Sequence, residues 1–374
     1  MYKSSFVPVN VPLIDGNEKK YLDECISSGW ISSEGPFVKQ FEAQFATRVQ
    51  RKHAIAVSSG TAALDVAVEA LGIGPGDEVI LPSFTIISCI SQIVRSGAKP
   101  VLVDSDPLTW NMDSNQIAEK ITKRTKAIMI VHIFGLPVDM ESIIDIATKH
   151  NIKIIEDAAE MHGQSYKNKP CGSFGEISTF SFYPNKHITT GEGGMVVTDD
   201  EQLAEDCRSL RNLCFQSQER FVHKRLGWNY RMTNVQAALG LAQLERLDEF
   251  VERKRRMGAK YTKMLRGLKN VQLPLSKMNY ANNIYWVFGL VLKNTLDFDA
   301  KEAIKRLREE DIDCRPFFYP MHKQPVLIKM GFFQSESYPV AERLSNRGLY
   351  IPSGMALTDE QINRVAKKVI EVLG

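Results

Sequence analysis

The sequence predicts an α/β protein with a large domain built on a mostly parallel mixed sheet and a smaller C-terminal α+β domain. Apolar strand-like runs alternate with helix-like segments up to about residue 200, which is typical of a parallel sheet covered by helices. One or two long helices then occupy residues 235–265, and a strand and two more helices follow. At 374 residues the chain is also long enough for two domains with sizeable cores.

The first predicted element is an N-terminal arm over residues 1–30, whose helical part is residues 16–29. Short apolar runs then predict four strands of the sheet at residues 77–82, 100–104, 127–133 and 152–157, with a helix at 140–151. In the C-terminal part we expect a strand at 285–292 and helices at 299–311 and 358–373. The large domain is therefore placed at residues 1–255 and the small domain at residues 256–374.

The bulk composition is that of an ordinary globular protein, with 44% hydrophobic residues, 24% charged residues and a net charge of +3. It has no basic block with interleaved aromatics that would predict nucleic-acid binding, no apolar run of membrane-spanning length, and no signal-peptide pattern at its start. The six cysteines form no C-x-x-C pair, and the seven histidines lack metal-ligand spacing. We therefore expect a cytoplasmic protein with reduced thiols, without a metal site and without a nucleic-acid or membrane partner.

One lysine, Lys186, lies in FSFYPNKHITTGEGGMVVTDD, between a short aromatic strand and a Gly-rich turn that leads into a strand at residues 195–198. Neighbouring apolar strands would desolvate its amine, lower its pKa and free the lone pair for nucleophilic attack. The glycines of the turn would let the backbone lie close to a bound ring. A lysine that forms a Schiff base with an aldehyde needs this setting, and the alternative is a solvated loop lysine beside a hairpin.

A carboxylate follows a buried strand in KIIEDAAEMHG, where Asp157 comes after Ile154 and Ile155. Ligand crevices of open α/β sheets lie at this end of a strand. A carboxylate there can pair with a protonated pyridine nitrogen, and Glu160 is close enough in sequence to reach a ring hydroxyl. The alternative is that Asp157 only caps a helix that begins at the following alanines.

A third segment, AIAVSSGTAALDVAVEALG, predicts a strand, a turn and a helix. The turn contains Ser59, Gly60 and Thr61, and it presents backbone N–H groups at a helix N-terminus, which suits a phosphate. By itself the segment is also compatible with an ordinary Ser/Thr-capped helix. Together the three segments supply a phosphate cradle, a pyridinium partner and an aldehyde-binding lysine, which are the groups that pyridoxal 5′-phosphate requires.

These segments resemble the sugar aminotransferases of the DegT/DnrJ/EryC1/StrS family over nearly the whole chain. The resemblance includes LGIGPGDEVILPSFT, GAKPVLVDSDPLTWNMD, TKAIMIVHIFGLPVDM and WNYRMTNVQAALGLAQLERLD. It implies the fold type I, aspartate aminotransferase-like architecture. Within the family, PLIDGNEKKYLDECISSGWISSEGPFVKQFE and IDCRPFFYPMHKQPV are most similar to GDP-perosamine synthases.

The resemblance implies roles for individual residues of the cofactor site. Lys186 would bind the cofactor aldehyde and shuttle protons, Asp157 would pair with the pyridine nitrogen, and Glu160 would sit near the ring hydroxyl. The phosphate would be held by the turn at Ser59, Gly60 and Thr61, by the Ser181 hydroxyl, and by Asn229 of a neighbouring subunit, so a homodimer with shared active sites is implied. Family members commonly have an aromatic residue at the position of Ile86, and the aliphatic side chain here forgoes the quadrupolar stacking contribution. Phe84 would point to the other face of the strand if the segment is extended.

Sugar-nucleotide contacts are expected from two segments and from the neighbourhood of Asn229. The loop GWISSEG contributes Trp30, Ile31 and Ser32, and CRPFFYPMH contributes Arg315, Tyr319 and His322. Arg315 would pair with a diphosphate and His322 with the sugar. Arg231 would serve a diphosphate or the glutamate carboxylate across the dimer. The alternative for each is a surface or interface salt bridge.

The implied reaction is a ping-pong transamination from L-glutamate to a nucleotide-linked 4-keto-6-deoxy sugar. Resemblance favours GDP-4-keto-6-deoxy-mannose as acceptor and GDP-perosamine as product, a building block of O-antigen or another surface polysaccharide. A UDP- or dTDP-linked acceptor of the viosamine type is the first alternative. A related dehydratase uses His where Lys186 stands, which disfavours that activity. A catalytically silent regulatory family member is the alternative of another class, and the intact set of site residues argues against it.

Overall fold

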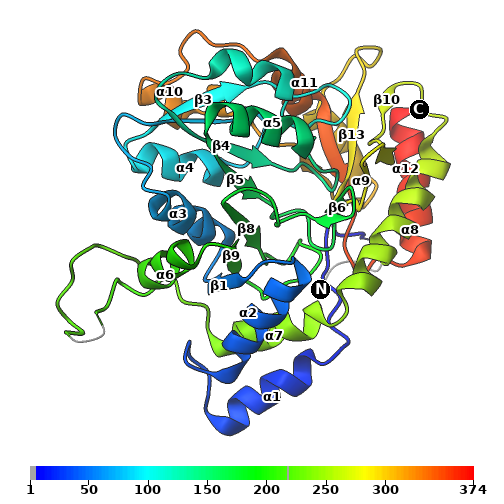
Figure 1. Ribbon diagram of the computed structural model, residues 1–374. Coiled ribbons are helices and arrows are strands. Elements are labelled where there is room, and N and C mark those ends of the chain that lie inside the picture. The colour runs from blue at the N-terminus through cyan, green and yellow to red at the C-terminus, as the bar shows by residue number, and fades with distance from the viewer. Residues whose placement is uncertain (1–5, 217–218) are drawn as a thin grey trace.

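A seven-stranded sheet forms the centre of the computed structural model, which describes residues 6–216 and 219–374 (Figure 1). Its strand order is β1-β9-β8-β5-β4-β2-β3. The strands are β1 (His53–Val57), β9 (Gly194–Thr198), β8 (Ile177–Ser181), β5 (Lys153–Asp157), β4 (Thr125–Val131), β2 (Glu78–Pro82) and β3 (Lys99–Val103). Within this sheet β9 pairs antiparallel with β1 and β8, and the remaining pairs are parallel. The predicted mostly parallel mixed sheet is confirmed.

Helices cover both faces of the sheet, because the buried strands are apolar on both sides. Ile55, Val196 and Ile155 belong to a core formed with α3 (Gly60–Ala70), α4 (Ile87–Arg95) and α6 (Glu201–Leu210). On the opposite face, alternate residues of the strands pack against three other helices, α2 (Pro36–Arg48), α5 (Met140–His150) and α7 (Asn234–Leu244). The predicted helix at 140–151 and its flanking strands therefore form where the sequence places them.

A second sheet lies in the C-terminal part, with the antiparallel order β10-β13-β15-β14. Its strands are β10 (Val271–Gln272), β13 (Phe288–Leu292), β15 (Gly348–Ile351) and β14 (Arg315–Pro316). The helices α9 (Ala300–Glu309) and α12 (Asp359–Leu373) form its core, and α10 (Pro325–Lys329) and α11 (Pro339–Arg347) lie between strands in sequence. The hairpins β6 (Ser165–Tyr166)–β7 (Lys169–Pro170) and β11 (Lys277–Met278)–β12 (Ala281–Asn282) complete the strands.

The long helix α8 (Leu247–Leu265) connects the two parts. Phe250 and Val251 in its first half pack into the core of the large sheet, whereas Tyr261 and Leu265 belong to the core of the C-terminal sheet. The expected boundary between residues 255 and 256 thus falls inside one continuous helix, and the two-domain division stays a prediction.

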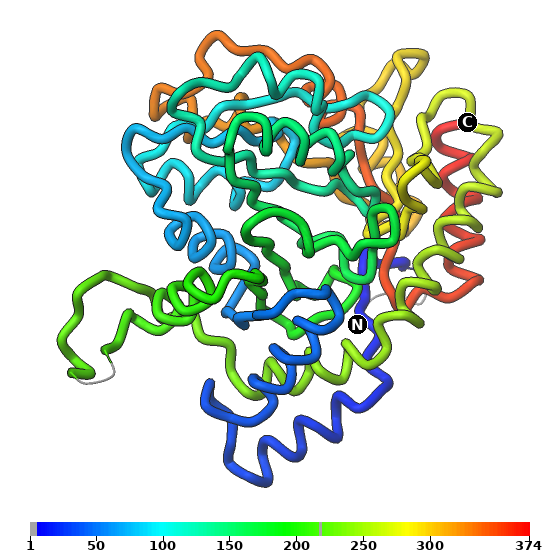
Figure 2. Tube along the Cα trace, in the orientation of Figure 1, coloured from blue at the N-terminus to red at the C-terminus, as the bar shows by residue number. Residues whose placement is uncertain are grey.

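The start of the described chain lies against the C-terminal part (Figure 2). Val7 donates its N–H to the Asp311 carbonyl and accepts a hydrogen bond from the Asp313 N–H, and Ser353 donates to the Val9 carbonyl. The chain then reaches α1 (Glu18–Ser28), which packs with α7. The first five residues of the expected arm lie outside the described residues. Among the described residues, no helix combines the length and the apolar character that crossing a bilayer requires.

Candidate active site

A cavity of about 390 Å³ opens where the carboxyl ends of several strands of the large sheet meet the helices that follow them. The residues expected to hold the cofactor that line it are Ser59, Gly60, Thr61, Ile86, Asp157, Glu160, Ser181 and Lys186. They come from the ends of β1, β2, β5 and β8, so parallel strand direction brings segments far apart in sequence to one edge of the sheet. Asn229 is the one expected cofactor residue outside this cavity.

Lys186 lies in the turn after β8, where its backbone N–H donates to the Tyr183 carbonyl. Its side chain is 10% exposed, and its Nζ lies 3.9 Å from Glu160 Oε1 and 3.9 Å from the centre of the Trp286 ring. Burial lowers the pKa of Lys186, and the nearby Glu160 and Asp157 act in the opposite direction. A buried amine with a lowered pKa is the state that a nucleophilic lysine requires.

Asp157 is the last residue of β5 and is buried. One carboxylate oxygen accepts the Ala159 N–H at 3.0 Å, and the other accepts the Cys89 thiol of α4 at 3.2 Å. Turns rather than a helix follow Asp157, so the alternative of a simple helix cap does not describe this residue. Burial raises the pKa of Asp157 above its usual range, and a cationic ring nitrogen beside it would lower that pKa again.

Glu160 lies in the turn that follows β5, close to the Lys186 amine. Its Oε2 accepts the Phe134 N–H at 2.6 Å, which leaves Oε1 directed toward Lys186. Burial raises the pKa of Glu160 to about 8, and the Lys186 charge acts in the opposite direction. At neutral pH this carboxyl group can therefore donate a hydrogen bond to a ring oxygen.

The opposite end of the cavity has the features of an anion site. Ser59 caps α3 by accepting the Ala62 N–H at 3.0 Å, so the first N–H groups of this 11-residue helix face the cavity. A Cβ at Gly60 would lie 2.7 Å from Ser181 Cβ, so the backbone is packed closely against the end of β8. The Thr61 hydroxyl lies 2.9 Å from that of Ser88. Anion cradle, lysine and buried carboxylate thus line one cavity, and this set fits pyridoxal 5′-phosphate.

Ile86 lines the cavity and is 46% exposed. The segment around it is not the extended strand on which the expectation for Phe84 depends, since β2 ends at Pro82 and α4 begins at Ile87. Phe84 is instead fully buried among Phe134, Phe317 and Phe318. It therefore offers no substitute for an aromatic residue at position 86.

The expected sugar-nucleotide residues do not gather in one place. Arg315 lines a second cavity of about 380 Å³ that shares Tyr183, Asn185, Trp286 and Tyr350 with the first. Tyr319 is half exposed and lines neither cavity. Arg231 bonds Asn212 at 2.5 Å, and Asn229 is exposed on the segment that follows α6. The exposed loop of Trp30, Ile31 and Ser32 is fixed by Asn234, which bonds the Trp30 and Ser32 carbonyls.

The expectation for His322 requires a correction. Its ring is buried, its Nδ1 lies 2.8 Å from the Ser83 hydroxyl, and its Nε2 lies 2.9 Å from Glu342. Both ring nitrogens are used inside the protein, so His322 ties the segment after β14 to the end of β2 and to α11. It does not offer a free donor or acceptor to a sugar.

Two residues near the reacting amine are absent from the expectations drawn from the sequence. The segment before β13 brings Trp286 next to Lys186, and α4 brings Cys89 next to Asp157. Their positions in the sequence carry no motif, because their role depends on tertiary contacts.

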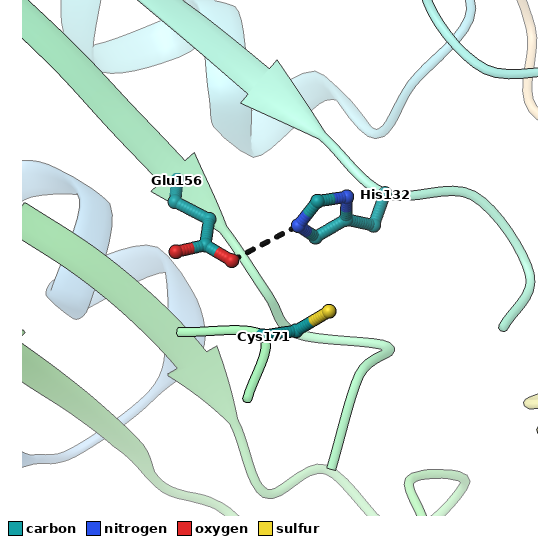
Figure 3. Close-up of side chains that lie close together, drawn as sticks. All are labelled: His132, Glu156 and Cys171. Carbon is teal, nitrogen blue, oxygen red and sulfur yellow. Dashed lines mark hydrogen bonds and ion pairs between the residues drawn. The ribbon is translucent and has the colours of Figure 1, made fainter. Parts of the chain in front are cut away.

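Among the residues that the structure describes, one cluster has the residue types of a metal site, namely His132, Glu156 and Cys171 (Figure 3). His132 Nδ1 accepts the Val138 N–H at 3.0 Å, so its Nε2 carries the hydrogen that faces Glu156 at 3.0 Å. Glu156 also accepts hydrogen bonds from Gly172 N–H, Phe174 N–H and the Ser178 hydroxyl. The polar groups of His132 and Glu156 are therefore already used in hydrogen bonds within the protein. Burial keeps the pKa of the Cys171 thiol well above its usual value.

Comparison with known proteins agrees with this geometry. The sequence profile of the DegT/DnrJ/EryC1/StrS aminotransferase family matches residues 12–370. The chain belongs to this family. It is 42% identical to the GDP-perosamine synthase of Escherichia coli O157:H7, with 98% of each chain covered, and 42% identical to that of Caulobacter vibrioides, also with 98% of each covered. The solved structure of S. venezuelae DesV in complex with a ketimine intermediate superposes with a TM-score of 0.88 at 33% identity, covering 97% of this chain and 98% of that one.

The protein is thus a fold type I aminotransferase, and pyridoxal 5′-phosphate is its cofactor. The cofactor supplies the electron sink that makes a carbanion accessible when it is bound. The residues that would hold it are on the walls of the cavity: the desolvated amine of Lys186, the Asp157 carboxylate, which would face the ring nitrogen, and the N-terminus of α3, which would face the phosphate.

Proposed function

We propose that the protein transfers the amino group of L-glutamate to the 4-keto carbon of GDP-4-keto-6-deoxy-D-mannose and so forms GDP-perosamine. The observation that carries the proposal is the buried Lys186 amine, held beside Glu160 and in the same cavity as Asp157. The two GDP-perosamine synthases that match nearly the whole chain favour this acceptor over UDP- or dTDP-linked sugars.

In this proposal Lys186 is the residue that moves the proton. As a free amine it takes the proton from the donor's α-carbon, and in the second half-reaction it returns a proton to the sugar carbon that accepts the amino group. Asp157 holds the ring nitrogen in its protonated state, and Glu160 faces the ring hydroxyl. Gly60 and Thr61 N–H groups, with the Ser59 turn and the Ser181 hydroxyl, hold the phosphate.

Arg315 is proposed to bind an anionic part of the substrate. Among the described residues that line the Lys186 cavity, the charged side chains are Asp157, Glu160, Glu192 and Lys186, so this cavity offers no guanidinium. The adjoining cavity contains Arg315, which Asp313 orients through a contact of 2.5 Å. Substrate carboxylate or diphosphate groups would be attracted there. Trp30, Ile31, Ser32, Tyr319 and Arg231 remain proposed contacts at the rim or across a subunit boundary.

We further propose a homodimer in the cytoplasm that serves O-antigen or related polysaccharide synthesis. The described residues of the segment after α6 project away from the body of the subunit (Figure 1), and Phe221 and Leu226 in it are 81% and 91% exposed. Asn229 follows these residues and is exposed, as a residue that reaches a neighbouring subunit's phosphate would be.

The acceptor test starts from the protein after its cofactor has been aminated by L-glutamate. GDP-, UDP- and dTDP-linked 4-keto-6-deoxy sugars are offered separately, and the amino sugar is identified by mass spectrometry and NMR. Formation of 4-amino product from the GDP sugar alone is the expected result. Preferential turnover of a UDP- or dTDP-linked sugar would move the assignment to the viosamine type, and turnover of none of the three sugars would overturn the assigned class of acceptor. A protein whose cofactor L-glutamate does not aminate would instead favour a silent family member.

A further inference from the structure

In the proposed amino transfer the Lys186 amine would be released when the amino donor replaces it and would stay free until the aminated sugar leaves, and the structure contains a specific place for this free amine. Lys186 Nζ lies 3.9 Å from the centre of the Trp286 ring, well within the distance at which an aromatic face attracts an ammonium group. On another side, Glu160 Oε1 lies 3.9 Å from the same nitrogen. Trp286 lines the cavity together with Lys186 and Asp157.

The Trp286 ring is held from several directions. Its Nε1 donates to the carbonyl of Asn185, the residue directly before Lys186, at 2.8 Å. Its own carbonyl accepts the Nζ of the buried Lys254 at 2.7 Å. The rings of Phe134 and Tyr350 lie 5.8 and 6.4 Å from it, centre to centre. The ring is therefore set in place before the lysine side chain moves.

Resting on the proposed amino transfer, we propose that Trp286 is a positioning residue whose indole face receives the Lys186 amine whenever that amine is not bonded to the cofactor. The ring stabilises the ammonium form in a site that otherwise desolvates it. It also keeps the long lysine side chain from turning to other acceptors, so the nitrogen stays next to the carbon at which the proton is exchanged.

Other titratable groups interact electrostatically with the Lys186 amine, and a test of Trp286 must leave these groups unchanged. These groups are Asp157 at the end of β5, Glu160 in the turn after it, Cys89 of α4, His162, and His187 beside the lysine. Two substitutions of Trp286 leave them all in place. Trp286→Phe keeps an aromatic face and loses the Nε1 donor, whereas Trp286→Leu loses both.

The experiment uses the full chain loaded with pyridoxamine 5′-phosphate, which leaves Lys186 free without any turnover. The pH dependence of amine labelling at Lys186 is followed by mass spectrometry with a slowly reacting acylating reagent. The midpoint of this profile is expected to move to lower pH in the order Trp, Phe, Leu. On the acid side of the midpoint, we expect Lys186 in the Leu variant to react about tenfold faster than in the wild type, with the Phe variant between them.

The order of the two variants decides the inference. Equal shifts in the Phe and Leu variants would show that the hydrogen bond to Asn185 matters and the ring face does not, and this result would overturn the inference. Unchanged profiles in both variants would overturn it as well. Trp110→Phe, a substitution of a buried tryptophan that shares the neighbour Phe134 with Trp286, is the control for loss of core volume and is expected to leave the profile unchanged. Because labelling requires neither glutamate nor a sugar, failure of the proposed acceptor would leave this result readable.

Discussion

At the scale of single residues, the account depends on the amine of Lys186. Replacing it by Ala removes the only side-chain amine among the described residues that line the cavity, so we expect amino transfer to fall by more than about a hundredfold. The Lys186→Arg variant retains a positive charge but has no free amine and is expected to be equally inactive. Steady-state assays of both variants check this, and an active Lys186→Arg enzyme would show that charge alone suffices.

Glu160 gives the protein a pH dependence with a defined sign. Burial raises its pKa from 4.5 to about 8, so between these values the folded chain holds a proton that the unfolded chain releases. Stability from this residue is therefore complete below about pH 4.5 and is lost as pH rises toward 8, by up to about 1.4 kcal/mol per pH unit. Urea unfolding of the cofactor-free chain at pH 6 and at pH 8 measures the free energy of unfolding. We expect this free energy to fall less between the two pH values in Glu160→Gln than in the wild type. Parallel losses in both proteins would contradict this assignment.

At the scale of elements, the anion end of the site depends on how closely β9 approaches the start of α3. A Cβ at Gly194, the first residue of β9, would lie 2.3 Å from the Ser59 carbonyl oxygen. Gly194→Ala must therefore displace the turn before α3, and we expect it to cost about 1–3 kcal/mol of stability and to weaken cofactor binding. Gly267→Ala, where a Cβ would meet no atom within 4 Å, is the matched control. Thermal melts and cofactor titrations of both variants check this, and equal behaviour would refute it.

The elements also mark how far sequence reasoning reaches. That Lys186, Asp157 and Gly60 line one cavity could be predicted because each ends or follows an apolar strand, and parallel strands bring their carboxyl ends to one edge. Trp286 and Cys89 were not predictable, since the packing of distant segments brings them to the site. His322 was assigned wrongly because a polar residue in a motif gives no sign that Ser83 and Glu342 already use its ring nitrogens.

At the scale of the whole molecule, the proposed homodimer makes a prediction for the segment after α6. Burying Phe221 and Leu226 against a second copy would contribute about 1.5–3 kcal/mol for each side chain. We therefore expect the double variant Phe221→Ser, Leu226→Ser to weaken the proposed dimer by at least about tenfold and to lose activity with it. Leu108→Ser, at another residue that is 61% exposed, should leave the proposed dimer intact. Sedimentation equilibrium distinguishes the two, and an unchanged dimer in the double variant would place the interface elsewhere.

The central claim, that the cavity around Lys186 performs amino transfer, is tested most directly by the absorbance spectrum of the purified protein with pyridoxal 5′-phosphate. We predict a band near about 410 nm from the lysine-bound cofactor, and its replacement by a band near about 330 nm when L-glutamate is added. A protein that shows no band near 410 nm, or one whose band L-glutamate leaves unchanged, would contradict the assignment of the first half-reaction to this site.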